Sequence, residues 1–214
     1  MSEPGLLRIL YQDQAIVVVD KPGGLLAVPG RGPDKQDSVV GRVRQMIPWC
    51  IDQPAAHRLD MDTYGLMVLG LTPAAHRHLS LQFAERRVGK RYLALLEGEV
   101  TGESGEITLP FRLDPANRPY QIYDPVQGKV GISRWQRIEI RSGRTRVLFT
   151  PLTGRTHQLR LHASHPLGLG CPVVGDRLYG AGCLGEQLML HAAWLQFVHP
   201  ETGQRVEFFS DPSF

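Results

Sequence analysis

Short apolar runs separated by polar turns dominate the hydrophobic pattern of this chain. Residues 16–19 are consecutive β-branched residues, which is typical of a buried strand, and the Lys-Pro-Gly-Gly turn at 21–24 ends this run. Comparable runs recur to the end of the chain. The pattern predicts strands over residues 8–11, 15–20, 65–71, 91–96, 106–109, 131–140, 145–150, 194–198 and 205–209.

Helix signals are fewer than strand signals. A cap at Asp37 or Ser38 and a stop before Pro48 predict a helix over 38–46. Thr72 followed by Pro73 indicates an N-cap and a first helical residue, so a second helix should run to about residue 85. Short helices are also expected over 157–164 and 185–190. Strands outnumber helices and do not alternate with them, which favours an α+β fold with a central mixed, mainly antiparallel sheet flanked by helices and loops.

Composition excludes several classes of protein. With 42% hydrophobic residues and a formal net charge of only +3, the 214-residue chain is not disordered. A pI near 8.9 permits nucleic-acid binding without requiring it. The three cysteines have no metal-type spacing, residues 1–5 lack the features of a signal peptide, and the apolar runs are too short to span a membrane. We therefore expect a reduced, cytoplasmic protein without a membrane partner.

Reactive side chains gather first at residues 57–65, immediately before an apolar strand. Loops at the entrance to a strand are held rigidly and often carry binding or catalytic groups. Asp60 is the best candidate for a nucleophile or base, and Arg58 is close enough in sequence to hold an anion. The alternative is a capped turn in which the Asp60 and Thr63 side chains bond backbone amides.

A second segment, residues 154–162, is the densest basic stretch of the chain. Arg155 and Thr156 are expected to open a helix, where backbone N–H groups favour anions. An arginine from this segment could also keep a buried aspartate ionised. An ordinary solvated helix is the alternative interpretation.

The third candidate is the strand segment 90–92. Strand alternation places Lys90 and Tyr92 on one face and Arg91 on the other. Tyr92 could stack on a base or move a proton, whereas the alternative is a tyrosine at the edge of the core. A metal site built from Asp60, Asp62 and the histidines at 157 and 162 matches no strong metal motif.

Together these segments resemble the RluA family of pseudouridine synthases. The family's motifs occur here in family order: K-P-x-G-L at 21–25, H-R-L-D-x-x-T-x-G-L at 57–66, K-x-Y at 90–92, G-R-x-H-Q-[I/L]-R-x-H at 154–162 and G-D-x-x-Y-G at 175–180. The resemblance implies the pseudouridine synthase fold, with an active-site cleft across the sheet. It also implies one catalytic domain over 1–214, without the N-terminal S4-like domain of many relatives, and an isomerase that needs no cofactor or metal.

The resemblance also implies residue roles. Asp60 would be the essential carboxylate, with Arg155 as its buried partner, and Tyr92 would stack against the base and take part in removing the C5 proton. Arg58 would fill the space of a base flipped out of its stack. Tyr64 stands where the family usually has Ser, which adds bulk and a stacking face beside the site. Residues expected to bind RNA are His57, Arg58, Thr63, Lys90, Leu159 and Arg160.

Resemblance to the short, dual-specificity members implies that the RNA is a stem-loop of large-subunit rRNA, a tRNA anticodon stem-loop, or both. No DNA partner is expected, and the default oligomeric state is a monomer. Two alternatives stay open, a non-catalytic RNA-binding module of the same fold and a metal-dependent hydrolase. The basic residues expected to line one cleft are Arg86, Arg87, Lys90, Arg91, Arg155 and Arg160.

Overall fold

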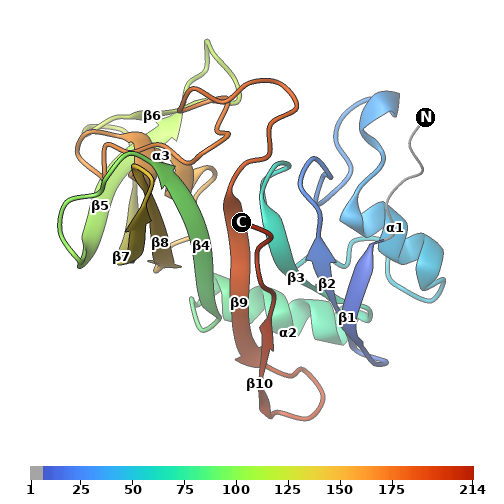
Figure 1. Ribbon diagram of the computed structural model, residues 1–214. Coiled ribbons are helices and arrows are strands. Elements are labelled where there is room, and N and C mark those ends of the chain that lie inside the picture. Colours follow the sequence, from blue (N-terminus) through green and yellow to red (C-terminus); the bar gives the residue numbers. More distant parts are fainter. Residues whose placement is uncertain (1–6) are drawn as a thin grey trace. The chain divides into compact units, whose positions relative to one another are not determined.

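The computed structural model describes residues 7–214, so the segment 1–5 considered above lies outside the described residues. The chain forms two compact units. The first unit comprises residues 7–90 and 192–212, and the second comprises residues 91–191 and 213–214. Strands β4 (Gly89–Glu97) and β9 (Leu190–Val198) each pass from one unit to the other (Figure 1).

The first unit is built on the strand order β1-β2-β3-β9, with β10 paired to β9. The pairs β1–β2, β2–β3 and β9–β10 are antiparallel. The β-branched run lies in β2 and is fully buried, because it is covered on both faces. The bounds of these strands are β1 Arg8–Gln12, β2 Ile16–Lys21, β3 Tyr64–Gly70 and β10 Arg205–Phe209.

Two capped helices belong to the first unit. Ser38 Oγ accepts a hydrogen bond from Gly41 N at 3.1 Å and caps α1 (Val39–Met46). Thr72 Oγ1 accepts from Ala75 N at 3.2 Å and caps α2 (Pro73–Ala84), which has Pro in its first turn. A short 3₁₀ helix, η1 (Pro33–Lys35), precedes α1. Helix α2 packs closely on β3, since a Cβ atom on Gly70 would overlap the helix backbone.

The second unit has the strand order β4-β8-β7-β5-β6. The pairs β4–β8, β8–β7, β7–β5 and β5–β6 are antiparallel. Its core joins sheet residues such as Val147 and Phe149 to Leu159 and Leu161 of the short helix α3. The bounds are β5 Ser104–Leu113, β6 Gln121–Tyr123, β7 Lys129–Arg141, β8 Arg144–Pro151 and α3 Gln158–Ser164.

The predicted fold class, α+β with a mainly antiparallel sheet, is confirmed. The expected helix over 185–190 is wrong: these residues are irregular up to the first residue of β9, and Gly185 has a positive φ of 92°, which does not fit a right-handed helix. Strand β6 and η1 were not predicted, because elements of three residues carry no periodic signal. Within residues 7–214, no helix has both the length and the apolar composition needed to cross a membrane.

Candidate active site

The loop that carries Asp60 is fastened by a buried lysine at the end of β2. Lys21 is 0% exposed, and its ammonium donates to the carbonyl oxygens of Pro22 at 2.8 Å, Leu25 at 2.8 Å and Met61 at 2.7 Å. An ammonium group has three N–H donors, so these carbonyls satisfy all of them. Lys21 therefore ties the Lys-Pro turn to the residue that follows Asp60.

The charge of Lys21 is set by opposing effects. Burial lowers the pKa of Lys21 to about 7, while the carboxylates of Asp62 and Asp60 raise it. Three carbonyl acceptors fit an ammonium better than a neutral amine, which has only two N–H donors. The hydrogen bonds thus favour the charged form at neutral pH, beside the carboxylates of the loop.

Asp60 begins a tight turn, and its side chain is not used to make that turn. The Asp60 carbonyl accepts from Thr63 N at 3.1 Å, and Thr63 is buried. No residue among 7–214 donates a hydrogen bond to the Asp60 carboxylate, which is half-buried. The capped-turn alternative needed that carboxylate to bond backbone amides, so it does not describe this loop.

His57 and Arg58 differ in their surroundings. The His57 ring stacks on Phe83, with centroids 4.3 Å apart and planes 19° apart, and its Nε2 accepts from Val68 N at 3.1 Å. Burial, with a smaller effect of the Lys90 charge, lowers the pKa of His57 to about 3. Although the residue as a whole is only half-buried, its covered ring anchors the loop as a neutral imidazole. These contacts support a structural role for His57, whereas Arg58 is exposed.

Tyr64, which replaces the family's usual Ser, packs against the Lys-Pro turn. A Cβ atom on Gly23 would overlap the Tyr64 ring, so the ring occupies the space that a side chain at Gly23 would need. Burial and the Asp62 charge both raise the pKa of Tyr64. The turn at 21–25 thus contacts the Asp60 loop through both Lys21 and Tyr64.

Strand β4 carries the third predicted group. Tyr92 is half-buried against the core of the second unit and pairs with Phe149 on β8. Arg91 is exposed and Lys90 is half-buried, which is the predicted alternation along the strand. Burial lowers the pKa of Lys90. Tyr92 thus lies at the edge of the core of its unit.

Arg155 lies in the second unit, and two expectations about it are wrong. Its side chain is exposed, whereas a buried one was expected. Helix α3 begins at Gln158 rather than at 155–156, and Arg155 N donates to Gln158 Oε1 at 3.0 Å, so this amide is not offered to an anion. Gln158 Oε1 also accepts from Thr153 Oγ1 at 2.7 Å, and its Nε2 donates to Ile132 O at 3.0 Å. The Arg155 segment is thus tied to β7 through the Gln158 side chain.

Leu159 and Arg160, which were expected to bind RNA, are both buried. The Arg160 guanidinium donates to the Asp176 carboxylate through Nε at 2.7 Å and Nη2 at 2.6 Å. Exposure of the two side chains is 3% and 0%. This pair joins α3 to the G-D-x-x-Y-G motif, and it removes Arg160 from the basic surface. The arginines at 86, 87, 91 and 155 are exposed.

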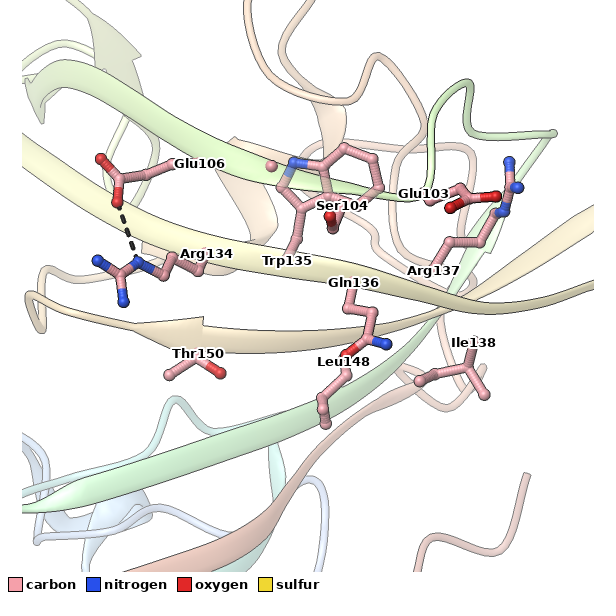
Figure 2. Close-up of a pocket in the computed structure, with 11 residues that line it drawn as sticks. Glu103, Ser104, Glu106, Arg134, Trp135, Gln136, Arg137, Ile138, Leu148 and Thr150 are labelled. Carbon is pink, nitrogen blue, oxygen red and sulfur yellow. Dashed lines mark hydrogen bonds and ion pairs between the residues drawn. The ribbon is translucent and has the colours of Figure 1, made fainter.

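A hollow of about 770 Å³ in the second unit lies elsewhere on the sheet (Figure 2). Its charges are balanced, as the Arg134–Glu106 ion pair at 3.2 Å illustrates. None of the candidate residues lines it, so the hollow does not locate the active site. The lining residues are Glu103, Ser104, Gly105, Glu106, Arg134, Trp135, Gln136, Arg137, Ile138, Leu148 and Thr150.

Comparison with known proteins shows to which family the chain belongs. A family model described as RNA pseudouridylate synthase matches residues 15–165. A protein of Haemophilus influenzae named dual-specificity RNA pseudouridine synthase RluA is 42% identical over 212 residues, covering 97% of this chain and 94% of that protein. The chain belongs to the RluA family of RNA pseudouridine synthases. It is therefore an RNA-modifying isomerase.

Similarity to further proteins supports the assignment of the chain to this family. The Escherichia coli K12 protein of the same name is 41% identical over 217 residues, covering 100% of this chain and 96% of that protein. The solved structure of human RNA Pseudouridylate Synthase Domain Containing 1 superposes with a TM-score of 0.79 at 31% identity, over 99% of this chain and 87% of that one. The pseudouridine synthase fold predicted from the motifs is thus confirmed.

Two structural residues of the synthase were missed from the sequence. Lys21 was noted only as part of a motif, although its hydrogen bonds hold the Asp60 loop. Asp176 was likewise noted only as part of a motif, although it is the buried partner of Arg160. Both residues act through contacts distant in sequence, which local patterns do not reveal. Residues 7–214 contain no group of three His, Cys, Asp or Glu side chains that could hold a metal ion.

Proposed function

We propose that the synthase isomerises uridines in a stem-loop of large-subunit rRNA and in tRNA anticodon stem-loops. The observation that carries this proposal is the 41–42% identity, over 97–100% of the chain, to proteins named as dual-specificity RNA pseudouridine synthases. Recognition of RNA commonly targets loops whose bases can leave the stack, rather than the deep and narrow major groove of duplex RNA.

Asp60 is the proposed catalytic carboxylate. Pseudouridine formation breaks the N1–C1′ bond of uridine, turns the freed base and joins C1′ to C5, while a proton leaves C5 and one is gained at N1. The reaction is an isomerisation, so atoms balance without a cofactor. Support for Asp60 comes from its place in the motif and from its turn, which Lys21 and Thr63 fix while leaving the carboxylate without a hydrogen-bond donor among residues 7–214.

Tyr92, Arg155 and Arg58 have proposed roles of their own. Tyr92 stacks against the base and takes part in removing the C5 proton, and its half-buried place on β4 suits a rigidly held group. Arg155 supplies positive charge that favours an ionised carboxylate. A base that leaves its stack costs a few kcal/mol, and the exposed guanidinium of Arg58 can replace the lost stacking.

The role of Asp60 is tested by Asp60→Asn in a tritium-release assay on RNA labelled at C5 of uridine. We expect turnover to fall by at least about 100-fold, in line with the loss of a catalytic carboxylate, while RNA affinity is retained. Asp52→Asn is the matched control, because Asp52 is an exposed carboxylate of the same unit that pairs with Arg44. Retained turnover in Asp60→Asn would show that another group performs the chemistry.

The substrates are tested with two synthetic RNAs, an rRNA stem-loop and a tRNA anticodon stem-loop, each incubated with the purified protein. Conversion of both is expected, with Asp60→Asn protein as the blank. Conversion of one alone would restrict the proposal to that RNA. Pseudouridine mapping of total RNA from a strain that lacks the gene then identifies the modified positions, and unchanged maps would refute the proposed targets.

A further inference from the structure

The residue two positions after Arg155 has an unusual backbone conformation. His157 has φ 55° and ψ 17°, the left-handed region, and it precedes the first residue of α3. A non-glycine residue in this region is strained by roughly 1–3 kcal/mol, and such residues persist only where surrounding contacts hold them. The structure therefore has to supply contacts that fix His157.

Tyr179 supplies one of these contacts. His157 is buried at 8% exposure, and its Nδ1 lies 2.8 Å from the Tyr179 hydroxyl. The two rings meet edge to face, with centroids 5.6 Å apart and planes 79° apart. The strained residue is thus held by its side chain from a segment more than twenty positions away along the chain.

Tyr179 is itself fixed from several sides. The Arg160 guanidinium lies over its ring at 5.3 Å from the centroid, and that guanidinium is paired with Asp176. Asp176 Oδ1 also accepts from Tyr179 N at 3.0 Å. The Tyr179 hydroxyl accepts from Gln121 N at 2.7 Å, at the first residue of β6. The hydroxyl therefore connects β6 to the segment that carries Arg155.

The hydrogen bond to Gln121 has a fixed direction, because a backbone N–H only donates and the Tyr179 hydroxyl therefore accepts from it. Between the hydroxyl and His157 Nδ1 the donor is set by the imidazole tautomer, and the bond forms with the proton on either side. Thr153, which precedes Arg155 in the chain, donates through its Oγ1 to Gln158 Oε1, and the same oxygen accepts from Arg155 N. Arg155 is thus exposed on a segment restrained on both sides of its side chain.

We propose that His157 and Tyr179 are positioning residues for the synthase reaction, holding the Arg155 segment in its strained form. The proposal rests on the proposed role of Arg155. A side chain with many rotatable bonds acts reproducibly only if its backbone is fixed, and misplacement of a catalytic group by about 1 Å can cost 100-fold in rate. Neither residue needs to touch the RNA for this effect.

The test uses Tyr179→Phe, which removes the hydroxyl and keeps the ring against Arg160. We expect the single-turnover rate of tritium release to fall about tenfold, with the RNA Kd changed by less than about twofold. Tyr120→Phe is the matched control, because Tyr120 lies edge to face with Tyr179 at 5.9 Å and its hydroxyl has no hydrogen-bond partner within residues 7–214. Its rate should equal that of the native protein.

His157→Gly provides a second variant that separates positioning from folding. Glycine adopts the left-handed conformation without strain, so the variant should fold as well as the native protein while losing the link to Tyr179. We expect the same rate loss of about tenfold, and partial recovery in His157→Asn, because Asn tolerates this conformation and offers a polar atom near the Nδ1 position. A purely structural role would instead lower stability and leave the rate of the folded fraction unchanged.

A double-mutant cycle with Arg155→Ala tests whether the two residues act through Arg155. In the Arg155→Ala background, Tyr179→Phe should have no further effect on the rate. Additive losses, or a Tyr179→Phe rate equal to that of the native protein, would overturn the proposal. If the native protein turned over neither proposed RNA, the proposed substrates would be wrong. The cycle could then be run on any uridine RNA that the native protein does convert.

Discussion

Replacement of Lys21 by Met tests how the Asp60 loop is held. The substitution keeps the length of the side chain and removes the ammonium that donates to the carbonyls of Pro22, Leu25 and Met61. The free energy of unfolding then changes through two opposing effects. The carbonyl of Leu25 is buried and those of Pro22 and Met61 are partly buried, so the loss of their donor, at about 1–3 kcal/mol for each buried carbonyl, destabilises the fold by at most roughly 9 kcal/mol.

The opposing effect is the removal of a buried charge. Lowering the pKa of Lys21 from 10.5 to about 7 corresponds to a burial cost of at most roughly 5 kcal/mol. Because this cost disappears in Lys21→Met, the upper values of the two effects, about 9 and about 5 kcal/mol, leave a net loss of stability of about 4 kcal/mol. The rate of catalysis has no opposing effect of this kind. Because Lys21 no longer holds the Met61 carbonyl, the neighbouring Asp60 is no longer fixed in position, and turnover should fall at least about tenfold.

The assay combines urea unfolding with tritium release from C5-labelled RNA. A pH series adds a second readout. The folded pKa of Lys21 lies below its unfolded value, so between pH 7 and 10.5 the unfolded chain binds more protons and stability rises with pH. This contribution should vanish in Lys21→Met and persist in Lys35→Met, a control at an exposed lysine. Native turnover in Lys21→Met would refute the reasoning.

Three further predictions concern stability. Arg160→Met leaves a buried carboxylate unpaired and should cost about 3–5 kcal/mol in urea unfolding, whereas Arg134→Met at an exposed ion pair should cost under about 1 kcal/mol; equal losses would contradict the burial argument. Gly23→Ala should lower the free energy of unfolding by about 1–3 kcal/mol through overlap with the Tyr64 ring, and adding Tyr64→Ser should restore most of this loss; a native unfolding curve for Gly23→Ala alone would show that the turn adapts. Burial lowers the pKa of His162 to about 4, so the unfolded chain binds the extra proton and stability should fall by roughly 3 kcal/mol as pH drops from 6.5 to 4. In His162→Leu this part of the acid loss should be absent at unchanged or higher stability at pH 7, because neither imidazole nitrogen has a partner among residues 7–214.

Local signals predicted most of the fold. Thr72 and Pro73 placed the start of α2 at the right residue, and the strand expected over 205–209 has the bounds of β10. These elements are specified by adjacent residues, through caps, β-branching and turn chemistry. The helix expected over 185–190 is wrong because Gly185 has a positive φ, which the fold around it determines and the local sequence does not reveal.

The candidate site was predictable only as far as its motifs reached. The sequence identified Asp60, Tyr92 and Arg155 as members of known motifs, but it could not show how their segments are fastened. Lys21 reaches Met61 across forty positions, and Arg160 reaches Asp176 across sixteen. Neither partnership leaves a periodic pattern, because each depends on which loops the fold brings together.

Arg155 and Arg160 show why charge alone is a poor guide to a nucleic-acid surface. They stand five positions apart in one motif, yet Arg155 is exposed and Arg160 is buried. Six of the seven residues of helix α3 are buried. The helix therefore has no amphipathic pattern from which the exposed residues could be predicted. The buried arginine is balanced by Asp176, and the net charge of +3 therefore resides on the other residues. Burial of Arg160 thus reduces the number of arginines available to the expected basic cleft, although the net charge stays the same. The function is therefore inferred from the motifs and not from the charge balance.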